Sequence, residues 1–168
     1  MNRWLRILKH RMLDEGDARR ALGEGALERI EQRVQASEAG HGGEIRVVVE
    51  AGLPLGYLWR GLQARDRAIT LFGKLRVWDT ERNNGVLIYL LLAEHRIEIL
   101  ADRGLARVVP QAHWQRIVEG MRAAFRAGRF EDGLNQAIDA VDAKLREHFP
   151  RGAGEVDANE LPDAPLIG

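Results

Sequence analysis

The sequence predicts a single α/β domain, an α/β/α sandwich in which helices cover both faces of a small mixed β-sheet. Segments with a helical spacing of apolar residues alternate with three short segments typical of strands, and one of these, residues 86–92, is apolar throughout. A strand that is apolar on both sides needs cover on both faces of its sheet. The length of 168 residues fits one domain whose core is large enough to need no disulfide or metal.

The composition excludes several classes of protein. The 25 Lys and Arg balance the 25 Asp and Glu, which argues against nucleic acid as a partner because domains that bind it usually carry a basic excess. Cysteine is absent, so thiolate catalysis, disulfides and cysteine zinc sites are excluded, and a reducing, cytoplasmic location is expected. The longest apolar run is far shorter than the ~20 residues that span a bilayer, and the start lacks the apolar run of a signal peptide.

Residues 1–20 form a basic amphipathic segment. On a helix, Trp4, Leu5, Leu8 and Met12 share one face while the basic residues lie mostly elsewhere. Such a segment can attach residues 1–12 peripherally to an anionic membrane or a membrane protein. The alternative is a helix that packs on its own domain or on a second subunit.

The domain itself is predicted over residues 21–150, and its first half contains helix, strand and helix. The first helix has about four turns and ends at the glycines of residues 40–43, since glycine readily adopts the conformations that follow a helix. Residues 44–50 alternate apolar and polar side chains and predict a strand. The second helix follows a loop and bends near Gly73. The apolar stripes are Leu22, Ala26, Leu27, Ile30 and Val34 in the first helix, and Leu62, Ile69, Phe72 and Leu75 in the second.

The second half begins with residues 86–92, the predicted central strand, and a four-residue polar break before a strand at 97–101. So short a connection makes these two an antiparallel hairpin, whereas strand 44–50 reaches the central strand through a helix and should lie parallel to it. Two more helices follow, one from near Pro110 to Gly128 and one that ends at Pro150. Residues 151–168, rich in Gly, Pro and acids such as Glu155 and Asp157, predict a mobile acidic tail.

This topology brings polar residues from distant segments to one edge of the sheet. Glu44 begins the first strand, Asn84 precedes the central strand and Asp102 follows the third. Parallel strands start at the same edge, and the returning strand of a hairpin ends there. The same edge is expected to hold Asp79, Glu81, Asn83 and Arg103.

An oxygen-rich set of side chains without His or Cys suits a hard cation such as calcium. Crowding of like charges would also raise a carboxyl pKa, which prepares a group for acid–base chemistry. The alternative is that residues 83–85 are a turn and the acids are solvated loop residues.

The order and spacing of several short motifs are also familiar: Gly43-Glu44 opening a strand, Asn84-Gly85-Val86-Leu87-Ile88 opening the central strand, Ile97-Glu98-Ile99, Gly104-Leu105 before a helix, and Phe125-Arg126-Ala127-Gly128-Arg129-Phe130 with Gly133-Leu134. Together they resemble the TPM domain, the thylakoid-lumen acid-phosphatase-like domain with many bacterial relatives. The resemblance covers about residues 22–149 and implies an α/β/α sandwich in a cytoplasmic, bacterial-type member. It also implies a role close to that of relatives that are described as acid phosphatases, bind calcium or associate with membrane proteins. This chain departs from the family pattern at Asn84, where Asp is usual, and at Ala106, where Glu is usual.

We therefore expect a TPM-like binding or accessory module, cytoplasmic and membrane-associated, that binds calcium or another divalent cation at Glu44, Asp79, Asn84 and Asp102. The alternative is a metal-assisted, acid-phosphatase-like hydrolase of phosphomonoesters, in which Asp102 or Asp79 manages protons and a metal or Arg103 offsets phosphate charge. The sequence reveals no pair of nucleophile and base. Whether the chain is an enzyme therefore stays open.

Overall fold

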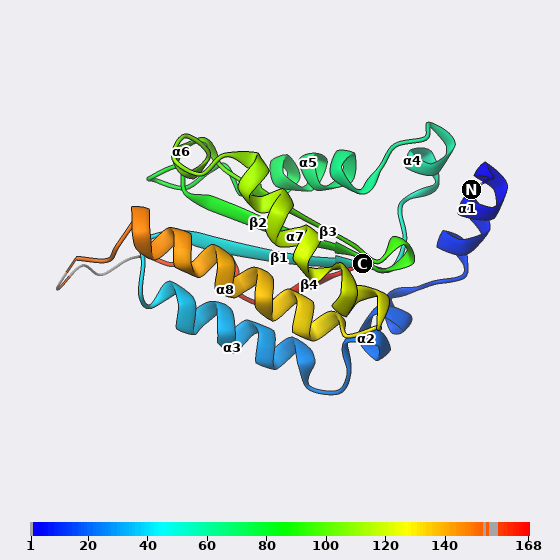
Figure 1. Ribbon diagram of the computed structural model, residues 1–168, viewed down its shortest axis with the longest axis horizontal. Helices are drawn as coiled ribbons and strands as arrows, with labels where there is room; N and C mark the ends of the chain where they lie inside the picture. Colours follow the sequence, from blue (N-terminus) through cyan, green and yellow to red (C-terminus); the bar gives the residue numbers. More distant parts are fainter. Residues whose placement is uncertain (1, 153, 155–157) are drawn as a thin grey trace.

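The computed structural model describes residues 2–152, 154 and 158–168 (Figure 1). Met1 of the N-terminal segment and Glu155 and Asp157 of the expected tail lie outside these residues. The elements are α1 (Arg3–Arg11), α2 (Glu15–Leu22), α3 (Ala26–Glu38), β1 (Glu44–Glu50), α4 (Leu55–Trp59), α5 (Ala64–Lys74), β2 (Gly85–Leu91), the 3₁₀ helix η1 (Leu92–Glu94), β3 (Arg96–Ala101), α6 (Arg103–Ala106), α7 (Gln111–Arg126), α8 (Phe130–His148) and β4 (Leu166–Ile167).

The sheet has the strand order β3-β2-β1-β4. β1 lies parallel to β2, and β2 and β3 form an antiparallel hairpin, as the sequence predicts. The apolar strand β2 lies in the middle of the sheet and is buried over its whole length. Its position follows from its composition, because a strand without polar side chains is stable only where both of its faces are covered.

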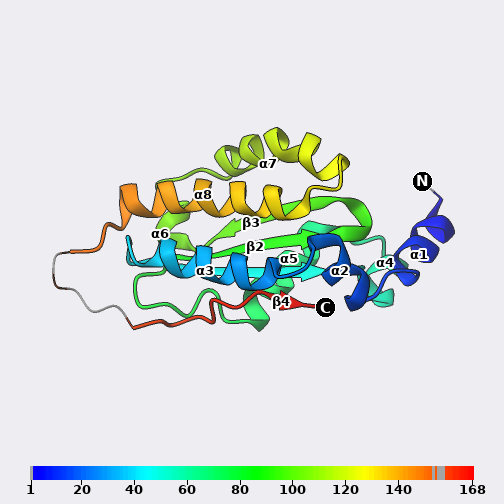
Figure 2. The same cartoon turned by 90° about the horizontal axis from the view of Figure 1, so that it is seen from below.

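Helices cover both faces of the sheet (Figures 1 and 2). One hydrophobic cluster joins alternate β2 residues, Val86, Ile88 and Leu90, to α2, α3, α7 and α8. A second cluster joins Leu87 and Tyr89, on the opposite face of β2, to α4 and α5. The predicted α/β/α sandwich is confirmed.

The first helix of the domain differs from the prediction. Leu22 ends α2, and a new helix, α3, begins at Ala26. Gly23 and Gly25 both have positive φ, 101° and 69°, which L side chains rarely adopt. The apolar spacing continues across this break because both helices pack on the same core, so periodicity alone does not reveal it.

Residues 158–168 of the expected mobile tail lie against the domain, and their last part pairs with β1 as the parallel strand β4. Leu161 is buried in the second hydrophobic cluster. A two-residue strand is too short for an alternating pattern, so its signal is missing from the sequence.

Within the described part of the chain, no helix has the length and apolar character needed to cross a membrane.

Candidate functional site

The register of the sheet places Glu44, Asn84 and Asp102 at the same edge. Glu44 pairs with Gly85, which follows Asn84, and the backbone N–H of Asp102 donates to the carbonyl of Gly85 at 2.8 Å. All three of these polar residues are buried. Topology thus brings the three segments together, and the local contacts decide what their side chains can bind.

These side chains are largely engaged by the protein itself. Asn84 Nδ2 donates to the carbonyl of Gly42 at 2.6 Å, and its Oδ1 accepts from Thr80 Oγ1 at 3.3 Å. Glu44 Oε2 accepts from the backbone N–H of Leu161 at 3.1 Å. Asp102 Oδ1 caps α6 by accepting from the Arg103 N–H at 2.7 Å. The other oxygen of Asp102, Oδ2, is buried and has no hydrogen-bond partner among the described residues.

The remaining predicted residues contact other groups. Asp79 is about half exposed and lies 3.7 Å from the guanidinium of Arg76. Arg103 Nε donates to Asn83 Oδ1 at 2.9 Å. In the described ranges, no group of three or more His, Cys, Asp or Glu is arranged to hold a metal ion. The cation-binding and phosphatase roles of these residues therefore stay predictions.

A buried carboxyl group with a raised pKa lies next to this edge. Burial, together with the nearby carboxylates of Glu44 and Asp163, raises the pKa of Glu38 to about 9. Its Oε1 accepts from the backbone N–H of Ile45 at 2.7 Å. Glu38, Glu44 and Asp163 line a small pocket of about 230 Å³. The Glu38 carboxyl therefore holds its proton to a higher pH than an ordinary glutamate does.

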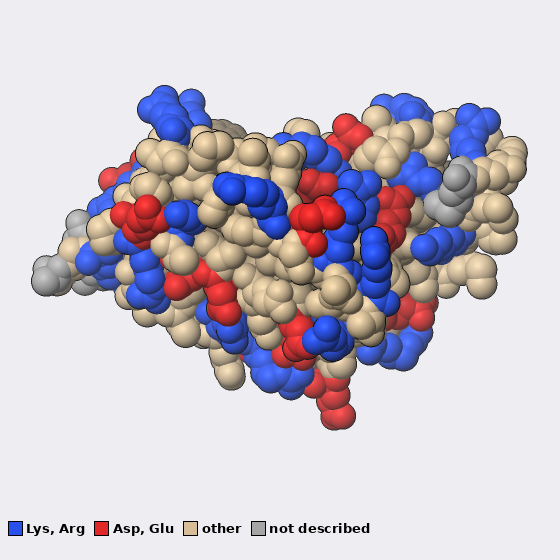
Figure 3. Space-filling view, in the orientation of Figure 1, with Lys and Arg blue, Asp and Glu red and all other residues tan. Residues whose placement is uncertain are grey.

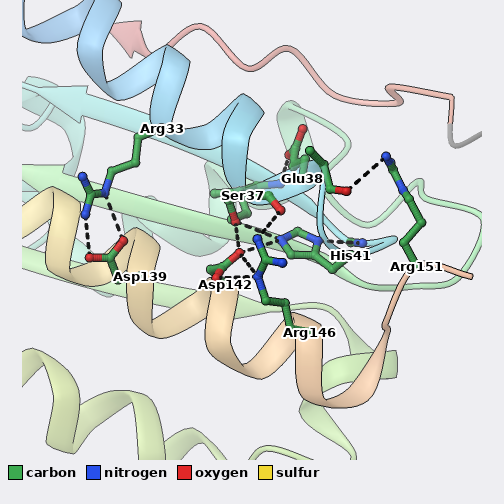
Figure 4. Close-up of polar contacts among 11 residues, drawn as sticks. Arg33, Ser37, Glu38, His41, Asp139, Asp142, Arg146 and Arg151 are labelled. Carbon is green, nitrogen blue, oxygen red and sulfur yellow. Dashed lines mark hydrogen bonds and ion pairs between the residues drawn. The ribbon is translucent and has the colours of Figure 1, made fainter. Parts of the chain in front are cut away.

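A Ser–His–Asp group, in which the serine and histidine are buried and the aspartate is partly buried, is the polar cluster that the sequence analysis missed (Figure 4). Ser37 and His41 are four residues apart at the end of α3, and His41 Nε2 lies 2.9 Å from Ser37 Oγ. Ser37 Oγ donates to Asp142 Oδ1 on α8 at 2.7 Å, and Arg146 binds the same carboxylate. The spacing of Ser37 from His41 is visible in the sequence, but the partner on α8 is more than 100 residues away.

The direction of these hydrogen bonds excludes Ser37 as an activated nucleophile. Burial lowers the pKa of His41 to about 4, so its ring is neutral at pH 7. The backbone N–H of Gly43 donates to His41 Nδ1, which leaves the ring proton on Nε2, facing Ser37. A base that accepts the serine proton is needed for catalysis, whereas here the serine proton points to Asp142. The cluster fastens α3 to α8.

A second feature lies at the other end of the molecule, where α1 contacts α4. Trp4 packs edge-on against Trp59 with ring centroids 5.5 Å apart. The α1–α4 surface consists of six large apolar side chains that are 51–73% exposed: Trp4, Leu5, Leu8, Met12, Leu55 and Trp59. Contiguous exposed apolar side chains on this scale are typical of interaction surfaces.

Helix α1 is held in this orientation by its polar side. Arg6 Nε donates to Glu94 Oε1 at 2.8 Å, and His10 Nε2 lies 3.1 Å from the same oxygen. The backbone N–H of Leu53 donates to His10 Nδ1 at 3.0 Å, so it is Nε2 that carries a proton and donates it to Glu94. An amphipathic helix usually buries its apolar stripe, whereas α1 buries Arg6 and His10 and turns its apolar face outward.

The charged residues of α1, and Arg60 directly after α4, are all basic. The first twelve residues contain no Asp or Glu, and Arg3, Lys9, Arg11 and Arg60 are all exposed. Arg3 also lies over the ring of Trp59 at 5.1 Å. The tip of the molecule formed by α1 and α4 is accordingly apolar and basic (Figure 3).

A family model and solved structures were compared with this chain, and their results agree. A model of the TPM domain matches residues 17–144, well over half of the chain. The chain is similar to the NMR structure of the BA42 protein from the psychrophilic bacterium Bizionia argentinensis, with a TM-score of 0.72, 28% identity, and coverage of 85% of this chain and 92% of that one. It shares its fold with the N-terminal domain of a protein from P. gingivalis, with a TM-score of 0.61, 23% identity, and coverage of 79% and 83%. No curated protein matches the sequence at a significant level. From the extent of the family match, the chain belongs to the TPM domain family.

Proposed function

We propose that this TPM-domain chain is an accessory binding module that docks peripherally on an anionic membrane surface through the α1–α4 surface. The observation that carries the proposal is the orientation of α1. Its buried face is fixed by Glu94 and its exposed face is apolar. A helix held in this way presents its apolar side chains to a partner without having to leave the domain.

The chemistry of the surface favours lipid as that partner. Tryptophan is enriched at membrane–water interfaces, and Trp4 and Trp59 are both about half exposed or more. Each Lys or Arg near an anionic membrane contributes about 1 kcal/mol, and Lys9 and Arg11 flank the apolar face at helical spacing. Absence of cysteine is consistent with a membrane that faces the cytoplasm.

Sedimentation with lipid vesicles tests this proposal. We expect the chain to sediment with vesicles that contain phosphatidylserine and much less with pure phosphatidylcholine. Leu8→Ser together with Met12→Ser should reduce sedimentation at least tenfold, because both side chains are exposed and apolar. Ile69→Ser, which removes a similarly exposed apolar side chain on α5, is the matched control and should have no effect. If the chain does not sediment with anionic vesicles but binds a membrane protein, the partner is protein and the proposal is wrong.

A divalent-cation site at the strand edge is a second candidate function, and Asp102 Oδ2 is the observation that favours it. This buried carboxylate oxygen has no hydrogen-bond partner in the part of the chain that the structure describes. Calcium at 100 times its Kd would stabilise the fold by about 2.7 kcal/mol. Asp102→Asn keeps the Oδ1 acceptor that caps α6 and should remove that gain. A melting temperature that does not respond to millimolar calcium would exclude the site.

A further inference from the structure

We propose that the polar side of β1 is a binding site for an extended peptide, and that the chain fills this site with its own residues 160–168, here called the strap. The proposal does not rest on the membrane role proposed for the α1–α4 surface. Its ligand class is an extended segment with a leucine near its start and one apolar residue near its end that packs on the core, as Ile167 does. In solution, the same site would accept such a segment from another protein when the strap is released.

Two charged side chains of β1 bind the main chain of the strap. Glu44 Oε2 accepts from the Leu161 N–H at 3.1 Å. Arg46 Nη1 donates to the carbonyl oxygens of Pro162 and Ala164 at 2.7 and 2.5 Å. Contacts to backbone groups are available from any peptide with the same extended shape. They are therefore a means of recognising a conformation rather than one particular sequence.

The end of the strap continues the sheet. Leu166 and Ile167 pair with Val48 and Val49 of β1 as a parallel strand. The Gly168 N–H donates to the Val49 carbonyl at 3.0 Å, and the Ala51 N–H donates to the Gly168 carbonyl at 2.8 Å. Addition of a strand to a sheet edge is a common mode of peptide recognition, in which backbone hydrogen bonds supply affinity and side-chain pockets supply specificity.

The side chain of Leu161 determines which peptide sequences the site accepts. Its side chain is buried in the cluster that contains Val48 and Leu58. Prolines at 162 and 165 favour an extended backbone and have no N–H group that the site would leave unpaired. Without an occupant, Arg46, now buried, would lose the two carbonyl groups that compensate its charge. An empty site is therefore unfavourable, which favours binding of the strap or of a similar peptide.

Binding of a labelled peptide with the sequence of residues 158–168 tests the proposal, measured by fluorescence anisotropy on the full chain. The wild-type chain should capture little of it, because its own strap competes at a millimolar effective concentration. Leu161→Asp should eject the strap and increase capture at least tenfold. Adding Arg46→Met to that variant should remove most of the gain, and a scrambled peptide should not bind.

Two further variants separate binding from folding. Ile167→Asn weakens the strap at its other end, where Ile167 packs on the core, and should also increase capture. Leu166→Asn, at a more exposed position in the same strand, is the matched control and should not. The proposal is overturned if a strap variant with a wild-type circular dichroism spectrum captures no peptide, or if Arg46→Met leaves its capture unchanged.

Discussion

Replacing Glu94 by glutamine tests whether α1 is held on the domain by charge. Burial opposes ionisation of Glu94, but the hydrogen bonds from His10 and Arg6 outweigh it and lower its pKa to about 2, from an ordinary value of 4.5. Each pKa unit corresponds to about 1.4 kcal/mol, so ionised Glu94 stabilises the fold by about 3 kcal/mol. Glutamine resembles the protonated acid, and Glu94→Gln should therefore lose about that amount at pH 7.

The effect of Glu94→Gln on the free energy of unfolding should depend on pH. Because the pKa of Glu94 is lower in the folded chain, its stabilisation is complete above about pH 5 and is lost as the pH falls toward 2. Urea unfolding of both proteins, followed by tryptophan fluorescence, should show a difference that shrinks to less than half by pH 3. A difference of the same size at pH 3 and pH 7, or none at pH 7, would refute the role assigned to Glu94.

Substitutions at His41, Gly104 and Gly120 should change the stability of the fold in different directions. The lowered pKa of His41 means that the unfolded chain takes up a proton first, so stability should fall between about pH 6.5 and pH 4, and His41→Gln should flatten that slope in thermal melts. Gly104→Ala would push a methyl group into the carbonyl oxygens of Asn83 and Arg82, and should lower the free energy of unfolding by about 1–3 kcal/mol. Gly120→Ala, in α7 with open space around it, should instead raise it by about 0.5–1 kcal/mol, and chemical denaturation distinguishes the two.

Periodicity was sufficient to predict the parts of the fold that are long and regular. The apolar strand β2 and its short connection to β3 fixed the hairpin, and the helical crossover from β1 fixed the parallel pair. The break between α2 and α3 and the strand β4 were missed for different reasons. At Gly23 and Gly25 the apolar pattern runs on across the break, and Leu166–Ile167 is ordered by a strand more than 100 residues away.

For the candidate sites, too, only part of the arrangement could be predicted from the sequence. Topology was enough to place Glu44, Asn84 and Asp102 at one edge of the sheet, but not to predict which backbone groups they bind. The amphipathic character of α1 was visible in the sequence, whereas its orientation was not. That orientation depends on Glu94, which lies 88 residues from Arg6 and carries no local signal.

Asn84 illustrates why a metal site expected from the family resemblance cannot be assigned to this chain without checking each residue. The usual aspartate at this position offers only acceptors when ionised, so its oxygen would face the carbonyl of Gly42 and be repelled unless a cation lay between them. The Nδ2 group of Asn84 makes that link directly, at 2.6 Å, and joins the residues before β1 to the start of β2. For a cation site at this edge we therefore propose Asp102, whose buried Oδ2 has no hydrogen-bond partner among the described residues, rather than Asn84. The Asn84 amide joins the two segments at this edge without an ion, which favours the α1–α4 surface as the place to seek the function of this chain.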